Sequence, residues 1–442
     1  MSSITERYYQ KHPGSVKRYE EAKQLFAGGV THDTRYTTPF PIYATHAKGP
    51  IKWDVDGNEY VDYVSGHGSL ILGHSHPAIE EVVARQIGRG THLGASTDEE
   101  LRWARAIKDL MPSVEKIRFH SSGTEATLMA FRLARAYTGR DKIIKLEDHF
   151  HGWQDYAVAT GGGVAGIPDG TLSSMIVLPP NDIPAVERAL EGGDVAAVML
   201  EPVGAHTGHM PLMVPQYLDD LRAVTRKHGA LLIMDEVVTG FRLSRGGAQV
   251  RFGIEPDLST MAKIVAGGLP GAAVGGKADI IDMIAFRDDP EWDAKRRIAH
   301  QGTFNANPLS ASTGATALEM IAREPINERA DAAAARLKAG FNEVFSKLEV
   351  AGHARGLASV VMVTFKDCGC DREVCTMGHS DIKEGSSPKF MGPLKRGMIN
   401  NGVDPMGRGT FIVSAVHENE HIDRTVAAFE ETLKAMREDG VV

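Results

Sequence analysis

Two residues at the ends of predicted strands, Asp235 and Lys263, could together carry out covalent chemistry on an amine. Asp235 follows the apolar run 230–234, which is short and bounded like a buried parallel strand. Lys263 comes 28 residues after Asp235 and follows a second, weaker strand-like stretch, 258–262. Ligands of open α/β sheets lie beyond the carboxyl ends of the strands, so the two side chains could face one ligand.

Pyridoxal phosphate needs such a pair of residues. A lysine forms the Schiff base with this cofactor, and a carboxylate keeps its pyridinium nitrogen protonated. The alternative is that Asp235 is an ordinary aspartate at the end of a strand and that Lys263 is a surface lysine. The other candidate residues along the chain decide between these interpretations.

The segment 121–126 is a candidate phosphate site. It reads Ser-Ser-Gly-Thr-Glu-Ala, follows a strand-like stretch and opens a predicted helix that ends at Gly139. Ser122 and Glu125 fit a capping box, which requires no ligand. Gly123 and the neighbouring hydroxyls at a helix N-terminus would also present free N–H groups and the helix dipole to an anion. The segment by itself is consistent with a capped helix or with a phosphate site.

Strands alternate with helices from about residue 115 to residue 275, which predicts an α/β fold with a doubly wound, mostly parallel sheet. We expect this large domain to span residues 71–315. A smaller α+β domain is expected over residues 316–442, and residues 1–70 are expected to pack with it as an N-terminal segment.

Three local predictions concern the parts outside the sheet. Residues 6–27 predict one polar helix, and Asp56-Gly57-Asn58 predicts the turn of a β-hairpin. A loop is expected between a strand at 359–365 and a strand that begins at Thr410.

Composition excludes several classes of protein. The net charge of −8 gives no support for nucleic-acid binding, and nothing approaches the 18 apolar residues of a membrane span. The first residues lack the apolar centre of a secretory signal. The three cysteines, at 368, 370 and 375, offer neither a disulfide framework nor zinc spacing. We therefore expect a cytoplasmic protein with no metal site.

Several short motifs in order resemble those of the class III, fold-type I pyridoxal phosphate-dependent aminotransferases. The similarity runs over nearly the whole chain, and it is greatest to the branch of glutamate-1-semialdehyde 2,1-aminomutase and its aminotransferase relatives. The motifs are Ser-Ser-Gly-Thr-Glu-Ala at 121–126, Phe-His-Gly at 150–152, Glu-Pro-Val at 201–203, Asp-Glu-Val at 235–237, Lys263, and Gly-Thr-Phe with Asn-Pro within 302–308.

The resemblance implies pyridoxal 5'-phosphate as cofactor and a role for each matching residue. Lys263 is expected to hold the cofactor as a Schiff base and to move the substrate proton, while Asp235 pairs with the ring nitrogen. The resemblance also implies a homodimer with shared active sites, because one phosphate contact comes from the neighbouring subunit. The other cofactor-site residues that it implies are Ser122, Gly123, Thr124, Phe150, His151, Glu201, Val237 and, from the neighbouring subunit, Thr303.

Three further residues are expected to bind the substrate, and they differ in part from the aminomutase pattern. Arg35 matches the position that binds a substrate carboxylate. His67 lies in Ser-Gly-His-Gly, where the aminomutase usually has a tryptophan within Gly-Ser-Trp-Gly. Arg408 precedes a strand, as in relatives that act on β-amino acids, and a second guanidinium suits a dicarboxylic oxo acid.

The predicted reaction is therefore transfer of an amino group from a carboxylate-bearing amino acid, including β- or unusual amino acids, to a 2-oxo acid. The alternative is the 2,1-aminomutase reaction, an intramolecular transfer. A racemase on the same scaffold is a third hypothesis. A non-enzymatic binding protein is a fourth, but it should lack Lys263 or carry a DNA-binding domain.

Overall fold

The computed structural model describes the chain except residues 1, 159–162, 204–215 and 367–376. The described residues form two compact units. One unit is continuous and spans residues 77–327, and the other combines residues 1–76 with residues 328–442.

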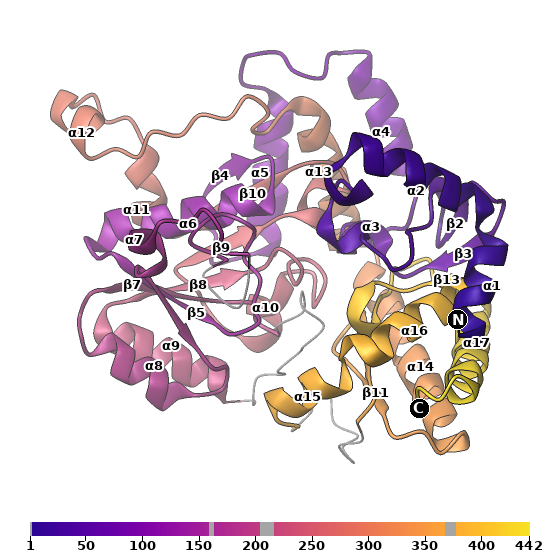
Figure 1. The fold of residues 1–442 in the computed structure, drawn as a ribbon. Helices are drawn as coiled ribbons and strands as arrows, with labels where there is room; N and C mark the ends of the chain where they lie inside the picture. The colour runs from indigo at the N-terminus through magenta and orange to yellow at the C-terminus, as the bar shows by residue number, and fades with distance from the viewer. Residues whose placement is uncertain (1, 159–162, 204–215, 367–376) are drawn as a thin grey trace. The chain divides into compact units, whose positions relative to one another are not determined.

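A seven-stranded sheet forms the centre of the continuous unit (Figure 1). The strand order is β4-β10-β9-β8-β7-β5-β6. Neighbouring strands from β9 to β6 are parallel, whereas β10 is antiparallel to both of its neighbours. The predicted α/β class with a mostly parallel sheet is confirmed. The strands are β4 (Lys116–His120), β5 (Lys142–Leu146), β6 (Met175–Leu178), β7 (Val195–Leu200), β8 (Leu231–Asp235), β9 (Leu258–Met261) and β10 (Ala272–Gly276).

Helices cover the sheet because their apolar faces match its buried side chains. Helix α6 packs Met129, Phe131 and Leu133 into a cluster with side chains from the central strands. On α5, Trp103 stacks on Phe119 of β4 with ring centroids 4.3 Å apart. The helices of this unit are α4 (Pro77–Ile87), α5 (Asp98–Leu110), α6 (Gly123–Thr138), α7 (Asp169–Leu172), α8 (Ile183–Leu190), α9 (Tyr217–His228), α10 (Gly247–Phe252), α11 (Ala278–Ile281), α12 (Pro290–Lys295) and α13 (Pro308–Arg323).

The second unit contains two small sheets, and one of them joins the two ends of the chain. One has the order β1-β2-β3-β13, in which Val403 of β13 pairs in parallel with Val61 of β3, and the other has the order β11-β12-β14. The hairpin turn predicted at Asp56-Gly57-Asn58 is confirmed, since it joins the antiparallel strands β2 and β3. The strands are β1 (Ala44–Lys48), β2 (Ile51–Asp54), β3 (Glu59–Asp62), β11 (His353–Arg355), β12 (Val360–Thr364), β13 (Val403–Asp404) and β14 (Thr410–Ile412).

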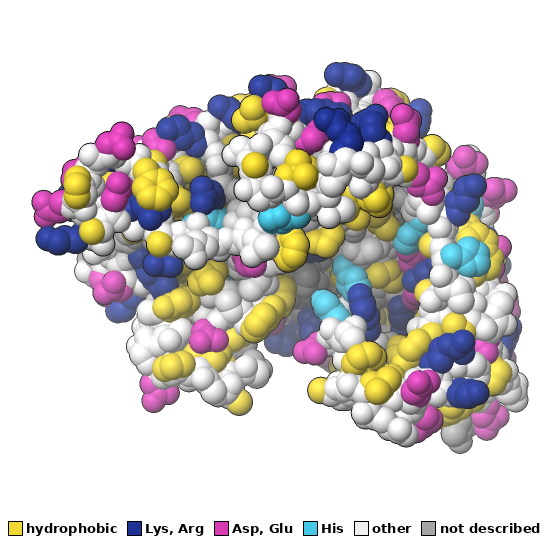
Figure 2. All heavy atoms as spheres, turned by 90° about the horizontal axis from the view of Figure 1, so that it is seen from above, with side chains coloured by type: hydrophobic (Ala, Val, Ile, Leu, Met, Phe, Trp, Pro, Cys, Tyr) yellow, Lys and Arg dark blue, Asp and Glu magenta, His cyan; other side chains and the backbone are white. Residues whose placement is uncertain are grey.

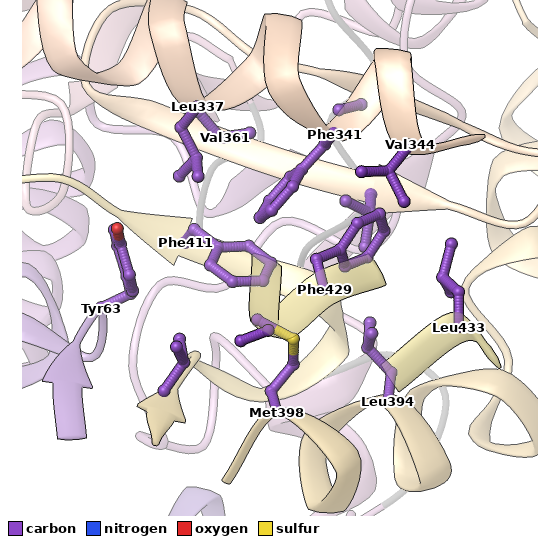
Figure 3. Close-up of a cluster of buried hydrophobic side chains, with 14 of the residues drawn as sticks. Tyr63, Leu337, Phe341, Val344, Val361, Leu394, Met398, Phe411, Phe429 and Leu433 are labelled. Atoms are coloured by element: carbon purple, nitrogen blue, oxygen red, sulfur yellow. The ribbon is translucent and has the colours of Figure 1, made fainter. Parts of the chain in front are cut away.

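Aromatic and aliphatic side chains from both ends of the sequence form the core of this second unit. Figure 3 shows Tyr63 beside Phe411, Phe411 beside Phe341, and Phe341 beside Phe429. Its helices are α1 (Ser3–Lys11), α2 (Pro13–Leu25), the short turn α3 (Ser65–Gly68), α14 (Ile326–Lys347), α15 (His379–Gly385), α16 (Pro388–Asn400) and α17 (Asn419–Glu438).

Two predictions about this unit are wrong. The single helix expected over residues 6–27 is two helices, because Pro13 cannot donate a hydrogen bond and disfavours helical backbone at His12. The loop expected before Thr410 contains α16, a 13-residue helix that begins with Pro388. Its apolar face buries Leu394 and Met398 in the core, which outweighs the helix-breaking Pro393.

No helix in the described part of the chain combines the length and apolar character needed to cross a bilayer.

A buried carboxylate fixes the turn that follows β8. Glu236 is 1% exposed and accepts hydrogen bonds from the N–H groups of Ala248 and Gln249, at 3.0 and 2.9 Å, and from the hydroxyl of Thr239. Glu236→Ala should lower the free energy of unfolding by about 2–4 kcal/mol, because these buried donors would lose their acceptor. Urea unfolding would measure the loss, with the exposed Glu255→Ala as the control. Equal unfolding midpoints for the two variants would contradict the assignment.

Candidate active site

The candidate catalytic side chains gather because consecutive parallel strands end at one edge of the sheet. Lys263, Asp235 and Glu201 follow or end the neighbouring strands β9, β8 and β7, and the segment 149–152 follows the next strand, β5. Strand β4 is antiparallel to β10, which is antiparallel to β9, so β4 is parallel to β9 and its carboxyl end lies at the same edge. This is the edge where ligands of open α/β sheets bind.

Asp235 is held in place by three hydrogen bonds. Its Oδ2 lies 2.6 Å from Nδ1 of His151, while its Oδ1 accepts from the N–H of Val237 at 3.0 Å and from the hydroxyl of Thr260 at 3.3 Å. Both Asp235 and His151 are buried. Burial lowers the pKa of His151, although Asp235 opposes this effect, so a neutral imidazole donates from Nδ1 and orients the carboxylate.

Lys263 combines an unusual backbone with an amine that loses its proton easily. Its φ of 57° lies in the left-handed region, which an L-residue enters only where the surrounding structure enforces it. Burial lowers the pKa of the amine to about 8, although Asp235 and Glu201 act in the opposite direction. About a tenth of Lys263 is therefore an unprotonated nucleophile at pH 7, far more than for an ordinary lysine.

The reactivity of Lys263 should rise with pH around a midpoint near 8. Below that pH the amine is protonated and inert, and above it the neutral form dominates, whereas an ordinary lysine needs a pH above about 10.4. Competitive acetylation of the cofactor-free protein, followed by peptide mass spectrometry, would measure the midpoint. Lys227 is the control, because it is exposed and Glu187 raises its pKa. A midpoint for Lys263 equal to that of Lys227 would contradict the prediction.

The N-terminus of α6 has the free donors that a phosphate requires. The capping box predicted from Ser122 and Glu125 is confirmed, and it satisfies the N–H groups of Ser121, Ser122 and Glu125. The N–H groups of Gly123 and Thr124 have no acceptor among the described residues. These donors, at the positive end of the helix dipole, fit a phosphate group.

Two glycines leave space at the N-terminus of α6 and allow the segment 150–152 to pack closely against it. A Cβ at Gly123 would lie 3.2 and 3.3 Å from the two methyl groups of Val237. At Gly152, whose φ is +92°, a Cβ would lie 2.6 Å from the hydroxyl oxygen of Thr124. The hydroxyl of Thr127 donates to the carbonyl of His151 at 2.6 Å. The segment 150–152 is thus fixed to the first turn of α6.

Among the other predicted cofactor residues of this unit, Phe150 follows β5 and Glu201 follows β7, whereas Thr303 precedes α13. The N–H of Phe150 donates to the carboxylate of Glu201 at 3.2 Å, and the phenyl ring is partly exposed. Glu201 is buried and follows β7 directly. Thr303 is exposed, and its carbonyl is hydrogen-bonded to the ring of His92. The structure describes one chain, so the neighbouring subunit's share in the site stays a prediction.

Two of the predicted substrate residues line one cavity in the second unit, and the third does not. The cavity has a volume of about 380 Å³, and Arg35 and His67 line it together with apolar side chains such as Val30 and Ile42. The guanidinium of Arg35 donates to the hydroxyl of Thr31 and has no carboxylate partner among the described residues. Arg408 is exposed in the turn before β14 and is not part of this lining.

A left-handed turn presents His67 to the cavity. Residues 65–68 have φ values of 47°, 59°, 57° and 90°, a conformation that costs a non-glycine residue roughly 1–2 kcal/mol. Nε2 of His67 lies 2.9 Å from the hydroxyl oxygen of Thr34, which in turn lies 2.8 Å from Nδ1 of His32. Strain of this kind is typical of functional sites.

A second buried amine, that of Lys145, lies near the candidate site and was not predicted from the sequence. It lies in β5, and its ammonium donates to the carbonyl of Ala157 at 2.7 Å. Burial lowers its pKa to about 8, while Glu201 raises it. A lysine among the apolar residues of the run 143–146 was the available signal. Cys368, Cys370 and Cys375, where no metal site is expected, lie outside the described residues.

Comparison with known proteins identifies the family to which the sequence is similar. Residues 33–381 match the model of the class-III aminotransferases. A glutamate-1-semialdehyde 2,1-aminomutase from Methanothrix thermoacetophila is 38% identical over 425 residues, which cover 94% of this chain and 95% of that protein. These matches confirm the resemblance predicted from the motifs.

Solved structures of similar sequence share the fold over nearly the full chain. An omega-transaminase from Sphaerobacter thermophilus has a TM-score of 0.87 and 32% identity, covering 97% of this chain and 99% of its own. A β-phenylalanine aminotransferase from Variovorax paradoxus has a TM-score of 0.84 and 28% identity, covering 98% and 97%. The matched family works with pyridoxal 5'-phosphate, which confirms the cofactor prediction.

Proposed function

Because the chain belongs to the class-III aminotransferase family, whose members are pyridoxal phosphate-dependent enzymes, we propose that it catalyses transfer of an amino group with Lys263 and Asp235 as its catalytic residues. One observation carries this proposal. A lysine whose pKa burial lowers and a carboxylate oriented by His151 follow or end adjacent parallel strands at the ligand-binding edge of the sheet.

The cofactor supplies, when bound, an aldehyde that condenses with amines and a ring that withdraws electrons. The neutral amine of Lys263 takes and returns the substrate proton at its Nζ. His151 holds Asp235 so that the carboxylate keeps a ring nitrogen protonated. The residues that would hold the cofactor are Ser122, Gly123 and Thr124 at its phosphate, Phe150 and Val237 at its ring, and His151 and Glu201 around them.

Intramolecular transfer, the glutamate-1-semialdehyde 2,1-aminomutase reaction, is the first candidate reaction. Curated relatives with this name, such as the one from Methanothrix thermoacetophila, cover almost the whole chain at about 38% identity. These relatives favour the aminomutase reaction, which the sequence motifs alone had placed second to transfer to a 2-oxo acid.

Transfer to a 2-oxo acid is the second candidate, and separate observations favour it. The solved omega-transaminase and β-phenylalanine aminotransferase cover almost the whole chain at 32% and 28% identity. His67 stands where the aminomutase usually has tryptophan, and it shares a largely apolar cavity with Arg35. Arg35 lacks a carboxylate partner among the described residues, which suits a substrate carboxylate. Arg408 would contact a second carboxylate.

Two product assays separate these reactions. The cofactor-saturated protein is incubated with glutamate 1-semialdehyde alone, and movement of the amino group from carbon 2 to carbon 1 supports the aminomutase. In the second assay, β-phenylalanine and 2-oxoglutarate are supplied, and formation of glutamate supports the aminotransferase. Retention of the amine with loss of the α-proton would indicate a racemase. Absence of all three reactions across a wider panel of amino donors would refute amino-group transfer.

We further propose a homodimer with shared active sites in the cytoplasm. The exposed Thr303 supports this assembly, because it is free to contact a phosphate bound by a second copy. Sedimentation velocity at several protein concentrations would test it.

A further inference from the structure

A second cavity lies in the continuous unit, at the edge strand of the seven-stranded sheet. Its volume is about 370 Å³, and its walls come from β4 and from residues 281–301. Figure 1 shows this second segment as an arm that carries α12 away from the sheet. None of the catalytic or cofactor-binding residues proposed above lines this cavity.

On the strand side, Arg118 is a half-buried cation without a carboxylate partner among the described residues. Its Nε donates to Nδ1 of His300 at 2.8 Å, and one Nη2 N–H donates to the carbonyl of the same residue at 3.1 Å. A guanidinium has five N–H donors, so three remain available. Because Nδ1 of His300 accepts, and because burial and Arg118 lower its pKa, His300 is neutral and adds no counter-charge.

On the arm side, Arg297 is a second cation with incomplete pairing. Its Nε is buried without a hydrogen-bond partner, and the nearest carboxylate oxygen, on Asp293, is 3.9 Å away. The guanidinium lies over the ring of Phe286 at 3.9 Å from the centroid. A buried donor without an acceptor is costly, and a ligand that accepts from it would remove that cost.

The two guanidinium groups leave an excess of positive charge in the cavity, which Asp293, 3.9 Å from Arg297, offsets only in part. The third cation of the lining, Lys116, is already paired with Asp282, whose two carboxylate oxygens lie 2.7 and 2.6 Å from its ammonium. Arginine binds phosphate and carboxylate with two parallel hydrogen bonds, and a dianion would match the excess charge. We propose that this cavity, formed by Arg118, Arg297 and His300, is a binding site for a phosphate monoester.

The size and the aromatic wall of the cavity indicate that the phosphate carries an organic group. A phosphate group alone would fill only a fraction of the available volume. The ring of Phe286 is 74% exposed and offers a face on which a flat group can stack. In Figure 2, hydrophobic, basic and acidic side chains lie close together at the end where Figure 1 places the arm with α12.

Titration calorimetry on the cofactor-saturated protein tests this site with two probes, inorganic phosphate and phenyl phosphate. Both should bind with saturation, and phenyl phosphate should bind several-fold more tightly. Arg118→Gln and Arg297→Gln should each raise both dissociation constants at least about tenfold, since each removes charge-assisted hydrogen bonds. Phe286→Ala should abolish only the advantage of phenyl phosphate. Lys295→Gln, an exposed charge change on the same arm, is the matched control and should change neither constant.

Three outcomes would overturn the proposal. The first is no saturable binding of either probe to the wild-type protein. The second is an equal increase in the dissociation constants of both probes in Arg297→Gln and in Lys295→Gln, which would show that binding depends on net charge alone. The third is loss of self-association in Arg118→Gln without any binding of the probes, which would assign the cavity to an acidic side chain of a second copy. Circular dichroism of each variant ensures that only folded protein is compared.

Discussion

Lys263→Ala should lower turnover by on the order of 10⁵-fold, the largest effect expected from any single substitution in this chain. The change removes the only amine that we assign to covalent attachment of the cofactor and to proton transfer at the substrate. Turnover should be measured at saturating pyridoxal phosphate, so that weaker cofactor binding does not cause the loss. Lys227→Ala removes an exposed lysine of the same unit and should leave turnover unchanged.

Borohydride reduction and peptide mapping provide an independent readout of the same residue. In the wild-type protein, the reduced cofactor should be found on the peptide that contains Lys263, and in Lys263→Ala it should be absent. A stable adduct on Lys145 in the active wild-type protein would contradict the assignment, because Lys145 is the other described lysine with a pKa near 8.

Asp235→Asn should lower turnover by about 10³-fold while the protein still folds and binds the cofactor phosphate. The amide has almost the same shape as the carboxylate, but it carries no charge to keep a ring nitrogen protonated. His151 would also lose its charged acceptor at 2.6 Å, so its pKa should fall further. The measurements are turnover at saturating cofactor and the dissociation constant of pyridoxal phosphate.

A surface aspartate provides the matched control for this substitution. Asp194→Asn makes the same chemical change where the carboxylate is half-exposed and pairs with Lys142. It should alter turnover less than twofold, in keeping with the small effects of surface substitutions. If Asp235→Asn retained wild-type turnover, Asp235 would have only a structural role, and the assignment of the ring-nitrogen partner would be wrong.

The sequence was sufficient to predict which strand ends carry the candidate site. Apolar runs before Asp235 and Lys263 identified buried strands, and a parallel sheet brings the carboxyl ends of such strands to one edge. The capping box at Ser122 was equally visible, because it depends on four consecutive residues. Features of this kind are encoded locally, so spacing alone predicts them.

Other features depend on contacts between distant residues, and the sequence could not predict them. The pairing of His151 with Asp235 joins residues 84 positions apart. The left-handed backbone of Lys263 is imposed by its surroundings, since lysine has no preference for that conformation. Helix α16 was missed because its prolines suggest a loop, whereas burial of its apolar face in the core decides the outcome.

The discontinuous second unit has a consequence for how the protein is made on the ribosome. Strand β3 leaves the ribosome early, but its partner β13 is synthesised about 340 residues later, after the whole intervening unit and part of the C-terminal segment. At 5–20 residues per second, that interval lasts about 17–70 seconds. During this time Tyr8, Tyr60 and Val61, which are buried in the finished protein, lack their C-terminal neighbours. The apolar N-terminal residues of the nascent chain therefore stay accessible to solvent until the C-terminal part has been made.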